Sequence, residues 1–208
     1  MKKQGIRNLI FDFGGVLIDL NRSRCIHNFE QLGITDVEQL LDLYRQEAFF
    51  HDYEVGKIDT ATFCQEIRNH SRQEITDKEI EDAWNSFLGT IPKFKLDTLL
   101  RLRQHYMVYL LSNTNEAHWK WSMKHAFPYK GFRVEDYFEQ IFLSYEMHQA
   151  KPDTEIFKTV LTETGIDPMQ TLFLDDSQAN CQAAESLGIK AHHVQPGEDW
   201  TTLFEQKK

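Results

Sequence analysis

Apolar runs alternate with segments of helical periodicity along this 208-residue chain, and this pattern limits the possible folds more than any other sequence feature. Strands are predicted at residues 6–13, 106–112, 140–144, 171–176 and 190–194. The first run alternates little between apolar and polar residues, which is typical of a strand buried on both faces of a parallel sheet. Because helices separate the strands, we expect parallel pairing with right-handed crossovers. The pattern predicts an α/β fold with a parallel sheet flanked by helices.

The predicted helices form two groups along the chain. Four of them follow the first strand with no second strand between them, at residues 22–32, 36–49, 60–70 and 77–88. The others alternate with the later strands, at residues 93–105, 115–126, 153–164 and 178–187. A capping box from Thr76 to Glu79 marks the start of the fourth helix. We therefore expect a core of residues 1–17 and 93–208, with a small helical cap of residues 18–92 inserted after the first strand.

Polar residues stand where the strands end or where the following segment begins. They are Asp12, Ser112-Asn113, Lys151-Pro152 and Asp175-Asp176. Pro152 is well placed as the first residue of the next helix. The carboxyl ends of parallel strands share one edge of a sheet, and ligands of open α/β sheets bind beyond that edge. The polar residues should therefore meet there, under a cap that leaves the chain just after Asp12.

The chemistry that suits this set is narrow. Three carboxylates repel one another unless a hard cation lies between them, and Mg²⁺ binds through carboxylates, waters and substrate phosphate. An ammonium, a hydroxyl and helix-start amides neutralise phosphate oxygens, and a carboxylate can form an aspartyl-phosphate. Singly, each residue also fits a structural role: Asp12 could be a buried partner of Lys151, and Asp175-Asp176 could cap a helix. Together they favour phosphoryl transfer from a small phosphorylated molecule.

The same residues resemble the four motifs of the haloacid dehalogenase-like hydrolase superfamily, over essentially the whole chain. The stretches FDFGGVL, LLSNTN, KPD and FLDDSQAN occur in the family's order, with a helical insert between the first two. Within the superfamily, the chain closely resembles small bacterial sugar-phosphatase-like members that hydrolyse glucose 1-phosphate. These share the D-x-G-x-V start, the S-N-T-N run and a cap segment like FHDYEVGKID.

The resemblance implies a role for each motif residue toward the phosphoryl group. Asp12 would attack phosphorus, and water would then hydrolyse the phospho-enzyme. Ser112 and Asn113 would bind the transferring phosphoryl oxygens. Lys151 would bind phosphate and orient Asp12.

The resemblance also implies a Mg²⁺ site and exposes one departure. Asp12, the backbone carbonyl of Gly14 and Asp176 would hold the ion, and Asp175 would bind it directly or through water. Most phosphatases of the superfamily carry an acid two residues after the nucleophile, where this chain has Gly14. The loss of such an acid typically removes about 10²–10⁴-fold in rate. The cap or a water could supply the proton, or a good leaving group such as the anomeric oxygen of glucose 1-phosphate could make it unnecessary.

Two other functions fit parts of the pattern. One is a phosphometabolite-binding or regulatory protein of low turnover. The other is a metal-free 2-haloacid dehalogenase, because those relatives also lack the second acid, although paired anions such as Asp175-Asp176 need a compensating charge. Within the cap, residues 49–56 either face the substrate or form a cap core with a turn at Gly56.

Composition limits the partners and the compartment. A net charge of −9 argues against nucleic acid and anionic membranes, and no apolar run is long enough to span a bilayer. Asp12 and Asp19 interrupt the apolar start, which argues against a signal peptide. Three widely spaced cysteines are expected to be free thiols. These features predict a cytoplasmic protein, as a monomer or homodimer.

Overall fold

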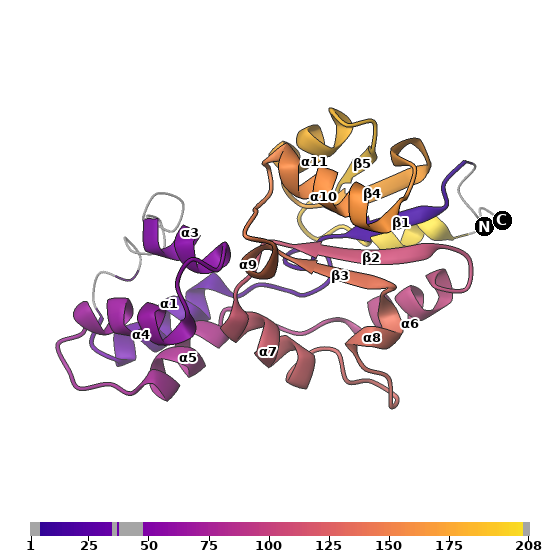
Figure 1. The fold of residues 1–208 in the computed structure, drawn as a ribbon. Coiled ribbons are helices and arrows are strands. Elements are labelled where there is room, and N and C mark those ends of the chain that lie inside the picture. Colours follow the sequence, from indigo (N-terminus) through magenta and orange to yellow (C-terminus); the bar gives the residue numbers. More distant parts are fainter. Residues whose placement is uncertain (1–4, 35–36, 38–47, 206–208) are drawn as a thin grey trace.

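A five-stranded sheet with helices on both faces forms the larger part of the computed structural model, which describes residues 5–34, 37 and 48–205 (Figure 1). Every neighbouring pair is parallel, and the strand order is β3-β2-β1-β4-β5. The strands are β1 (Asn8–Phe11), β2 (Met107–Ser112), β3 (Gln140–Leu143), β4 (Thr171–Asp175) and β5 (Lys190–His193). The predicted fold class is confirmed.

Both faces of the central strands are buried, which explains their continuous apolar sequences. Leu9 and Phe11 of β1 lie in one hydrophobic cluster, while Ile10 lies in another, because successive side chains of a strand point to opposite faces. The first cluster is closed by α6 (Lys93–Leu102), α7 (Glu116–His125), α8 (Val134–Tyr137) and η2 (Trp200–Phe204). The second is closed by α10 (Thr154–Thr164) and α11 (Gln178–Glu185).

Two further short elements complete this part, and one helix start differs from the prediction. The short elements are α9 (Ser144–Met147) and η1 (Pro168–Gln170). Pro152 is not the first residue of a helix, so that prediction is wrong: Asp153 is the N-cap of α10, and its side chain accepts a hydrogen bond from Glu155 N at 3.0 Å. The N-cap position belongs to Asp153 because its carboxylate satisfies a free amide of the first turn.

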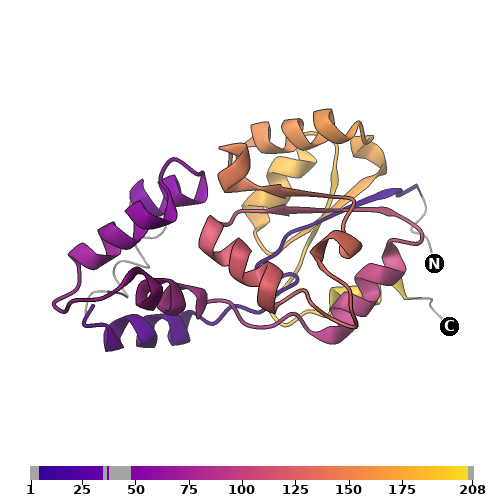
Figure 2. The same ribbon diagram turned by 60° about the horizontal axis from the view of Figure 1, so that its bottom comes forward.

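The inserted helices lie beyond the carboxyl ends of the strands (Figures 1 and 2). They are α1 (Arg22–Gln31), α3 (Ala48–Glu54), α4 (Thr60–Asn69) and α5 (Asp77–Asn85). Their buried apolar side chains form a cluster of their own around Phe63 and Trp84. The predicted capping box at Thr76 and Glu79 is confirmed. Most of the helix predicted at 36–49 falls outside the described residues, and its last two residues belong to α3.

The two segments that join the insert to the sheet run antiparallel to each other. Asp19 N donates to Thr90 O at 3.2 Å, Gly89 N donates to Asp19 O at 2.7 Å, and the Asn21 amide donates to Phe87 O at 2.7 Å. Leu88 packs with the sheet cluster rather than with the insert. We propose that the chain divides into a core of residues 1–17 and 93–208 and an inserted cap of residues 18–92.

Two smaller sequence predictions have structural counterparts. All three cysteines are free thiols and are buried. Within the described part of the chain, no helix combines the length and the apolar character needed to cross a membrane.

Candidate active site

The register of the two central strands brings the first two predicted carboxylates together. Phe11 pairs with Leu174 between β1 and β4, and Asp12 N donates to Leu174 O at 2.9 Å. Asp175, the last residue of β4, follows directly. Asp12 and Asp175 therefore lie side by side at the carboxyl edge of the sheet, where the strand order changes direction.

Lys151 joins these carboxylates with an ammonium group that uses all three of its N–H donors. Its Nζ donates to Asp12 Oδ1 and Asp175 Oδ2, each at 2.7 Å, and to Leu111 O at 3.0 Å. Burial lowers the pKa of this ammonium, but the two carboxylates outweigh burial and hold the pKa above its usual value. Lys151 is therefore a charged residue that fixes the orientation of the Asp12 carboxylate.

Asn113 holds the backbone of Lys151 in place. Its Nδ2 donates to Lys151 O at 2.8 Å, and its Oδ1 accepts from Lys151 N at 2.9 Å. The Asn113 side chain thus links the end of β2 to the segment after α9, and its amide is engaged with the protein in this arrangement. Ser112, 1% exposed, ends β2 beside it, with a long contact of 3.3 Å from its Oγ to Asn113 O.

The Asp12 carboxyl group has an electrostatic environment that suits a reactive group. Burial raises its pKa to about 7, the Lys151 ammonium opposes that rise, and the nearby Asp175 charge adds to it. Asp12 is 8% exposed. The Asp12 carboxylate is therefore poorly solvated, and its negative charge is stabilised mainly by the Lys151 ammonium that contacts it.

Asp175 is fully buried and has hydrogen-bond donors on both oxygens. Oδ1 accepts from Ser177 N at 2.8 Å and from Asn180 Nδ2 at 3.0 Å, while Oδ2 accepts from Lys151. Asn180 was missed by the sequence reasoning. Its place in the first turn of the helix that follows the Asp-Asp-Ser stretch would have indicated it, because side chains there face the preceding strand end.

Asp176 lies close to the Asp12 and Asp175 carboxylates but is more exposed than either of them. Burial raises the pKa of this carboxyl, and the neighbouring Asp175 charge raises it further. Gly15 lies against it with φ +69°, and a Cβ at Gly15 would overlap the Asp176 carboxylate. The second glycine after Asp12 is therefore required both by its left-handed backbone and by the close approach of Asp176.

The three aspartates form an arrangement that fits a divalent cation. Asp12, Asp175 and Asp176 each offer an oxygen that lies within 4.8 Å of the others, the one such group found among the described residues. With Lys151, three carboxylates and one ammonium leave a net charge of −2. Hard cations such as Mg²⁺ take carboxylate and carbonyl oxygens as ligands, and a phosphate needs such a cation to approach an anionic site.

A cavity of about 1050 Å³ lies over this cluster. Six of the seven predicted site residues line it: Asp12, Gly14, Ser112, Asn113, Lys151 and Asp176. Asp175 lies behind them, since it is 0% exposed. From the insert side the cavity is lined by His51, Glu54, Phe87 and Leu88, so the insert forms part of its wall.

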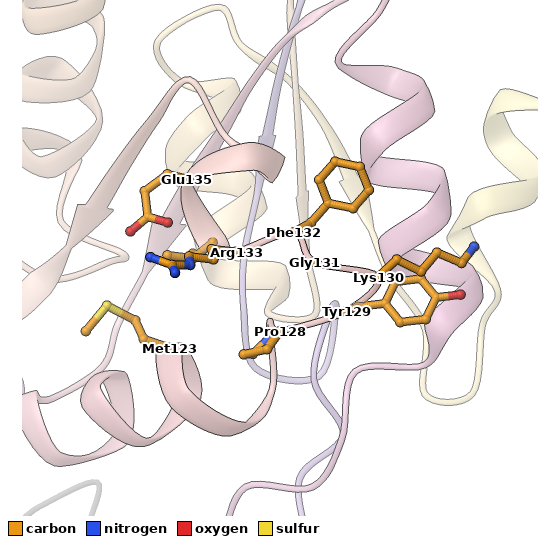
Figure 3. A pocket seen from close by; sticks show the side chains of 9 residues that line it. Met123, Pro128, Tyr129, Lys130, Gly131, Phe132, Arg133 and Glu135 are labelled. Carbon is orange, nitrogen blue, oxygen red and sulfur yellow. The ribbon is translucent and has the colours of Figure 1, made fainter.

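A second cavity, of about 610 Å³, lies elsewhere in the fold (Figure 3). Its wall is formed by residues 128–135 together with Met123 of α7. It contains none of the residues at the carboxyl ends of the strands. The chemistry predicted from the sequence therefore belongs to the larger cavity.

His118 ties the insert to the sheet, and sequence reasoning missed it. Its ring stacks on Trp84 with centroids 4.5 Å apart, and its Nε2 contacts Trp84 O at 3.1 Å. Its Nδ1 lies 3.3 Å from Asn115 Nδ2, so the neutral tautomer with hydrogen on Nε2 satisfies both contacts. Burial lowers the pKa of His118 to about 4, against which the Trp84 contact acts weakly.

Ser144 is a third missed residue, although the sequence carried a signal for it. Its Oγ accepts from Thr114 N at 2.9 Å and lies 2.6 Å from Glu54 O and 2.9 Å from Thr114 O. It follows the last residue of β3, so it belongs to the same pattern of polar residues at strand ends. Its hydroxyl connects the loop after β2 with the end of α3.

Comparison with known proteins identifies the family to which this arrangement belongs. The family model of the haloacid dehalogenase-like hydrolases matches residues 6–188. The chain belongs to this hydrolase family. The match extends from β1 to just beyond α11, and so includes both the strand-end residues and the insert.

Individual relatives extend the similarity over nearly the whole chain. A D-ribitol-5-phosphate phosphatase of Bacteroides thetaiotaomicron is 35% identical over 94% of this chain and 95% of its own length. The structure of a HAD family enzyme from the same organism, in complex with magnesium and inorganic phosphate, is 52% identical with a TM-score of 0.92, covering 96% of this chain and 100% of its own. A predicted HAD-like hydrolase of Porphyromonas gingivalis is 35% identical with a TM-score of 0.87, covering 97% and 99%.

Proposed function

We propose that this protein is a magnesium-dependent phosphatase that hydrolyses a phosphate monoester of a small metabolite through an aspartyl-phosphate on Asp12. The observation that carries the proposal is the cluster of Asp12, Lys151, Asp175 and Asp176, of which all but the buried Asp175 line one cavity. The magnesium and phosphate in the structure of the related enzyme support it.

In the proposed reaction each residue of the site has a separate role. Asp12 attacks phosphorus with the carboxylate oxygen that Lys151 does not hold, and water then hydrolyses the acyl phosphate. Ser112 and the main-chain N–H of Asn113 bind phosphoryl oxygens, since the Asn113 amide side chain is engaged with Lys151. Lys151 exchanges one of its hydrogen bonds for a phosphoryl oxygen when substrate is bound.

The metal would be held by Asp12, Asp176 and the carbonyl of Gly14. When bound, it supplies the positive charge that lets a phosphate approach a cluster with a net charge of −2. Asp175 would act through water or by orienting its neighbours, because both its oxygens already accept hydrogen bonds from Ser177, Asn180 and Lys151.

We propose a sugar phosphate or sugar-alcohol phosphate as the substrate. The related phosphatase acts, by its name, on D-ribitol 5-phosphate, and a cavity of about 1050 Å³ accommodates a phosphate with a five- or six-carbon leaving group. Glucose 1-phosphate, which the sequence resemblance favours, remains the alternative substrate within the same class.

Phosphate release measured with magnesium and with EDTA tests the function. The panel is D-ribitol 5-phosphate, glucose 1-phosphate, glucose 6-phosphate and p-nitrophenyl phosphate, on the wild type and Asp12→Asn. Magnesium-dependent release that the substitution abolishes is the expected result. Tight binding of a phosphate mimic with negligible release would favour the regulatory alternative, and metal-independent halide release from a 2-haloacid would establish a dehalogenase.

A further inference from the structure

Asp176 is the proposed magnesium ligand that lies just beyond the end of β4. The pairing of β4 with the edge strand β5 stops at Asp175 and His193, so the ladder of the sheet does not hold the main chain of Asp176 (Figure 1). An aspartate side chain is short and adopts few rotamers, so the place of its carboxylate follows the orientation of its backbone. Contacts outside the ladder must therefore orient the peptide unit that follows Asp176.

Hydrogen bonds hold this peptide unit at both ends. The N–H of Ser177 donates to Asp175 Oδ1 at 2.8 Å, and His193 Nε2 donates to Asp176 O at 3.0 Å. A peptide unit is planar, and in the trans form its N–H and C=O point in opposite directions. The two bonds therefore oppose rotation of the unit, which fixes the direction in which Asp176 presents its side chain.

Gln195 fixes the hydrogen of the His193 ring on the nitrogen that faces Asp176. Gln195 Nε2 lies 3.0 Å from His193 Nδ1 and 3.2 Å from His193 O, and it donates to both. His193 Nδ1 is therefore an acceptor, and in the neutral ring Nε2 carries the hydrogen that Asp176 O accepts. The donor and acceptor roles agree at both ring nitrogens.

Glu198 holds the loop that carries Gln195. Its Oε2 accepts from Gln195 N at 2.8 Å, and its Oε1 lies 2.7 Å from His192 Nε2. His192 and His193 are neighbours on β5, so their side chains point to opposite faces of the sheet. One imidazole fastens the loop and the other contacts the proposed metal ligand, which makes His192 a matched comparison for His193.

The Asp176 carboxylate has little room on the side of the loop that follows Asp12. It lies against Gly15 so closely that a Cβ there would overlap it. Displacement toward Gly15 is therefore blocked by backbone. A looser peptide unit after Asp176 would move the carboxylate away from this loop and out of the group that it forms with Asp12 and Asp175.

We propose that His193 is a positioning residue of the magnesium site, which holds the Asp176 carboxylate in the place where it binds the ion. This role rests on the proposed function. His193 is not among the described residues that line the cavity, so it acts through the main chain of Asp176 rather than on substrate. Its loss should weaken magnesium binding and leave Asp12 and Lys151 in place.

Calorimetric titration with magnesium chloride alone measures the affinity for the ion without substrate. His193→Leu removes the donor and keeps a side chain of similar size, so we expect the magnesium Kd to rise about 10-fold, equivalent to about 1.4 kcal/mol. His193→Gln keeps an N–H donor and should hold the Kd within about threefold of the wild-type value. In the phosphate-release assay of His193→Leu, the magnesium concentration for half-maximal rate should rise by the same 10-fold factor, whereas kcat at saturating magnesium should fall less than about threefold.

Two further variants separate positioning from a general loosening of β5. His192→Leu removes the neighbouring imidazole and its contact with Glu198, so it should ease unfolding in EDTA and leave the magnesium Kd unchanged. Gln195→Ala keeps the imidazole but frees the ring to adopt the other tautomer. Its magnesium Kd should rise in the same direction as in His193→Leu, by about threefold. Gln195→Ala also decides the question if His193→Leu does not fold.

An unchanged magnesium Kd in His193→Leu, or in Gln195→Ala where His193→Leu does not fold, would overturn the positioning role and leave the phosphatase function intact. An equal weakening in His192→Leu, or no recovery in His193→Gln, would do the same. If the wild type binds magnesium but releases phosphate from no ester, the proposed function fails while the positioning role stands. If the wild type neither binds magnesium nor releases phosphate, both fail together.

Discussion

Lowering the pH should weaken the attachment of the insert through one residue, His118. Its pKa is about 4 in the folded protein against an ordinary value of 6.5, because burial between Trp84 and Phe87 disfavours the charged ring. A base with a depressed folded-state pKa binds more protons when unfolded. The folded state therefore has its full stability above about pH 6.5 and loses it as the pH falls toward 4.

The size of the effect follows from the shift. A difference of about 2.5 pKa units corresponds to about 3 kcal/mol between the two limits, of which about 2 kcal/mol is lost by pH 5. His118→Phe keeps an aromatic ring in the stack but cannot be protonated. It also loses the hydrogen bonds to Trp84 O and Asn115, which should cost about 1–3 kcal/mol near neutral pH.

Urea unfolding of both proteins between about pH 7.5 and pH 5 measures the difference directly. Other titrating groups act equally in the two proteins, so they cancel when the unfolding free energies are subtracted. The wild type should be the more stable near neutral pH, and its advantage should shrink by about 2 kcal/mol at pH 5. A difference that stays constant across this range would refute the argument that His118 is held neutral by burial.

Three other changes have expected outcomes that follow from single contacts. Gly15→Ala places a methyl group against the Asp176 carboxylate and strains a left-handed backbone. The free energy of unfolding should fall by about 1–2 kcal/mol, and activity should require a higher magnesium concentration. An unchanged dependence of activity on magnesium would contradict this. Asn180→Ala removes the amide that contacts both Asp175 oxygens. Urea unfolding should show a free energy of unfolding lower by about 1–3 kcal/mol. In the enzyme assay, kcat should fall by a larger factor than KM rises. Ser144→Ala removes the hydroxyl that joins Glu54 O of the insert to Thr114 N and should lower the free energy of unfolding by about 1–3 kcal/mol. Limited proteolysis of the insert provides a second measurement. Protease resistance equal to that of the wild type would show that the other contacts suffice to hold the insert.

Much of the arrangement at the sheet edge could be predicted because it depends on chain order alone. Parallel strands joined by helices put their carboxyl ends on one edge, so Asp12, Ser112 and Asp175 had to approach one another once the strands were recognised. The register that sets Phe11 opposite Leu174 could not be predicted, although it determines that Asp12 meets Asp175. Register depends on side-chain packing between strands, which a single sequence does not display.

The parts that were missed are short or depend on contacts between distant segments. Helices of four residues, such as α8 and α9, are too short for apolar periodicity to reveal them. The prediction ended a helix at residue 49, whereas α3 continues to Glu54. Gly56, in a left-handed conformation just beyond that end, was the available signal, since glycine commonly follows the last turn of a helix.

The residues that hold the insert come from the same strand ends as the residues that form the site. Ser112 ends β2, and Asn115 and His118 follow it within six residues to contact Trp84 of the insert. Ser144 follows β3 and contacts the carbonyl of Glu54. A displacement of the insert would therefore strain the loops after β2 and β3, which carry residues of the proposed site. Because the same loops carry both sets of residues, the wall that the insert contributes to the cavity is held in a fixed position relative to the strand ends.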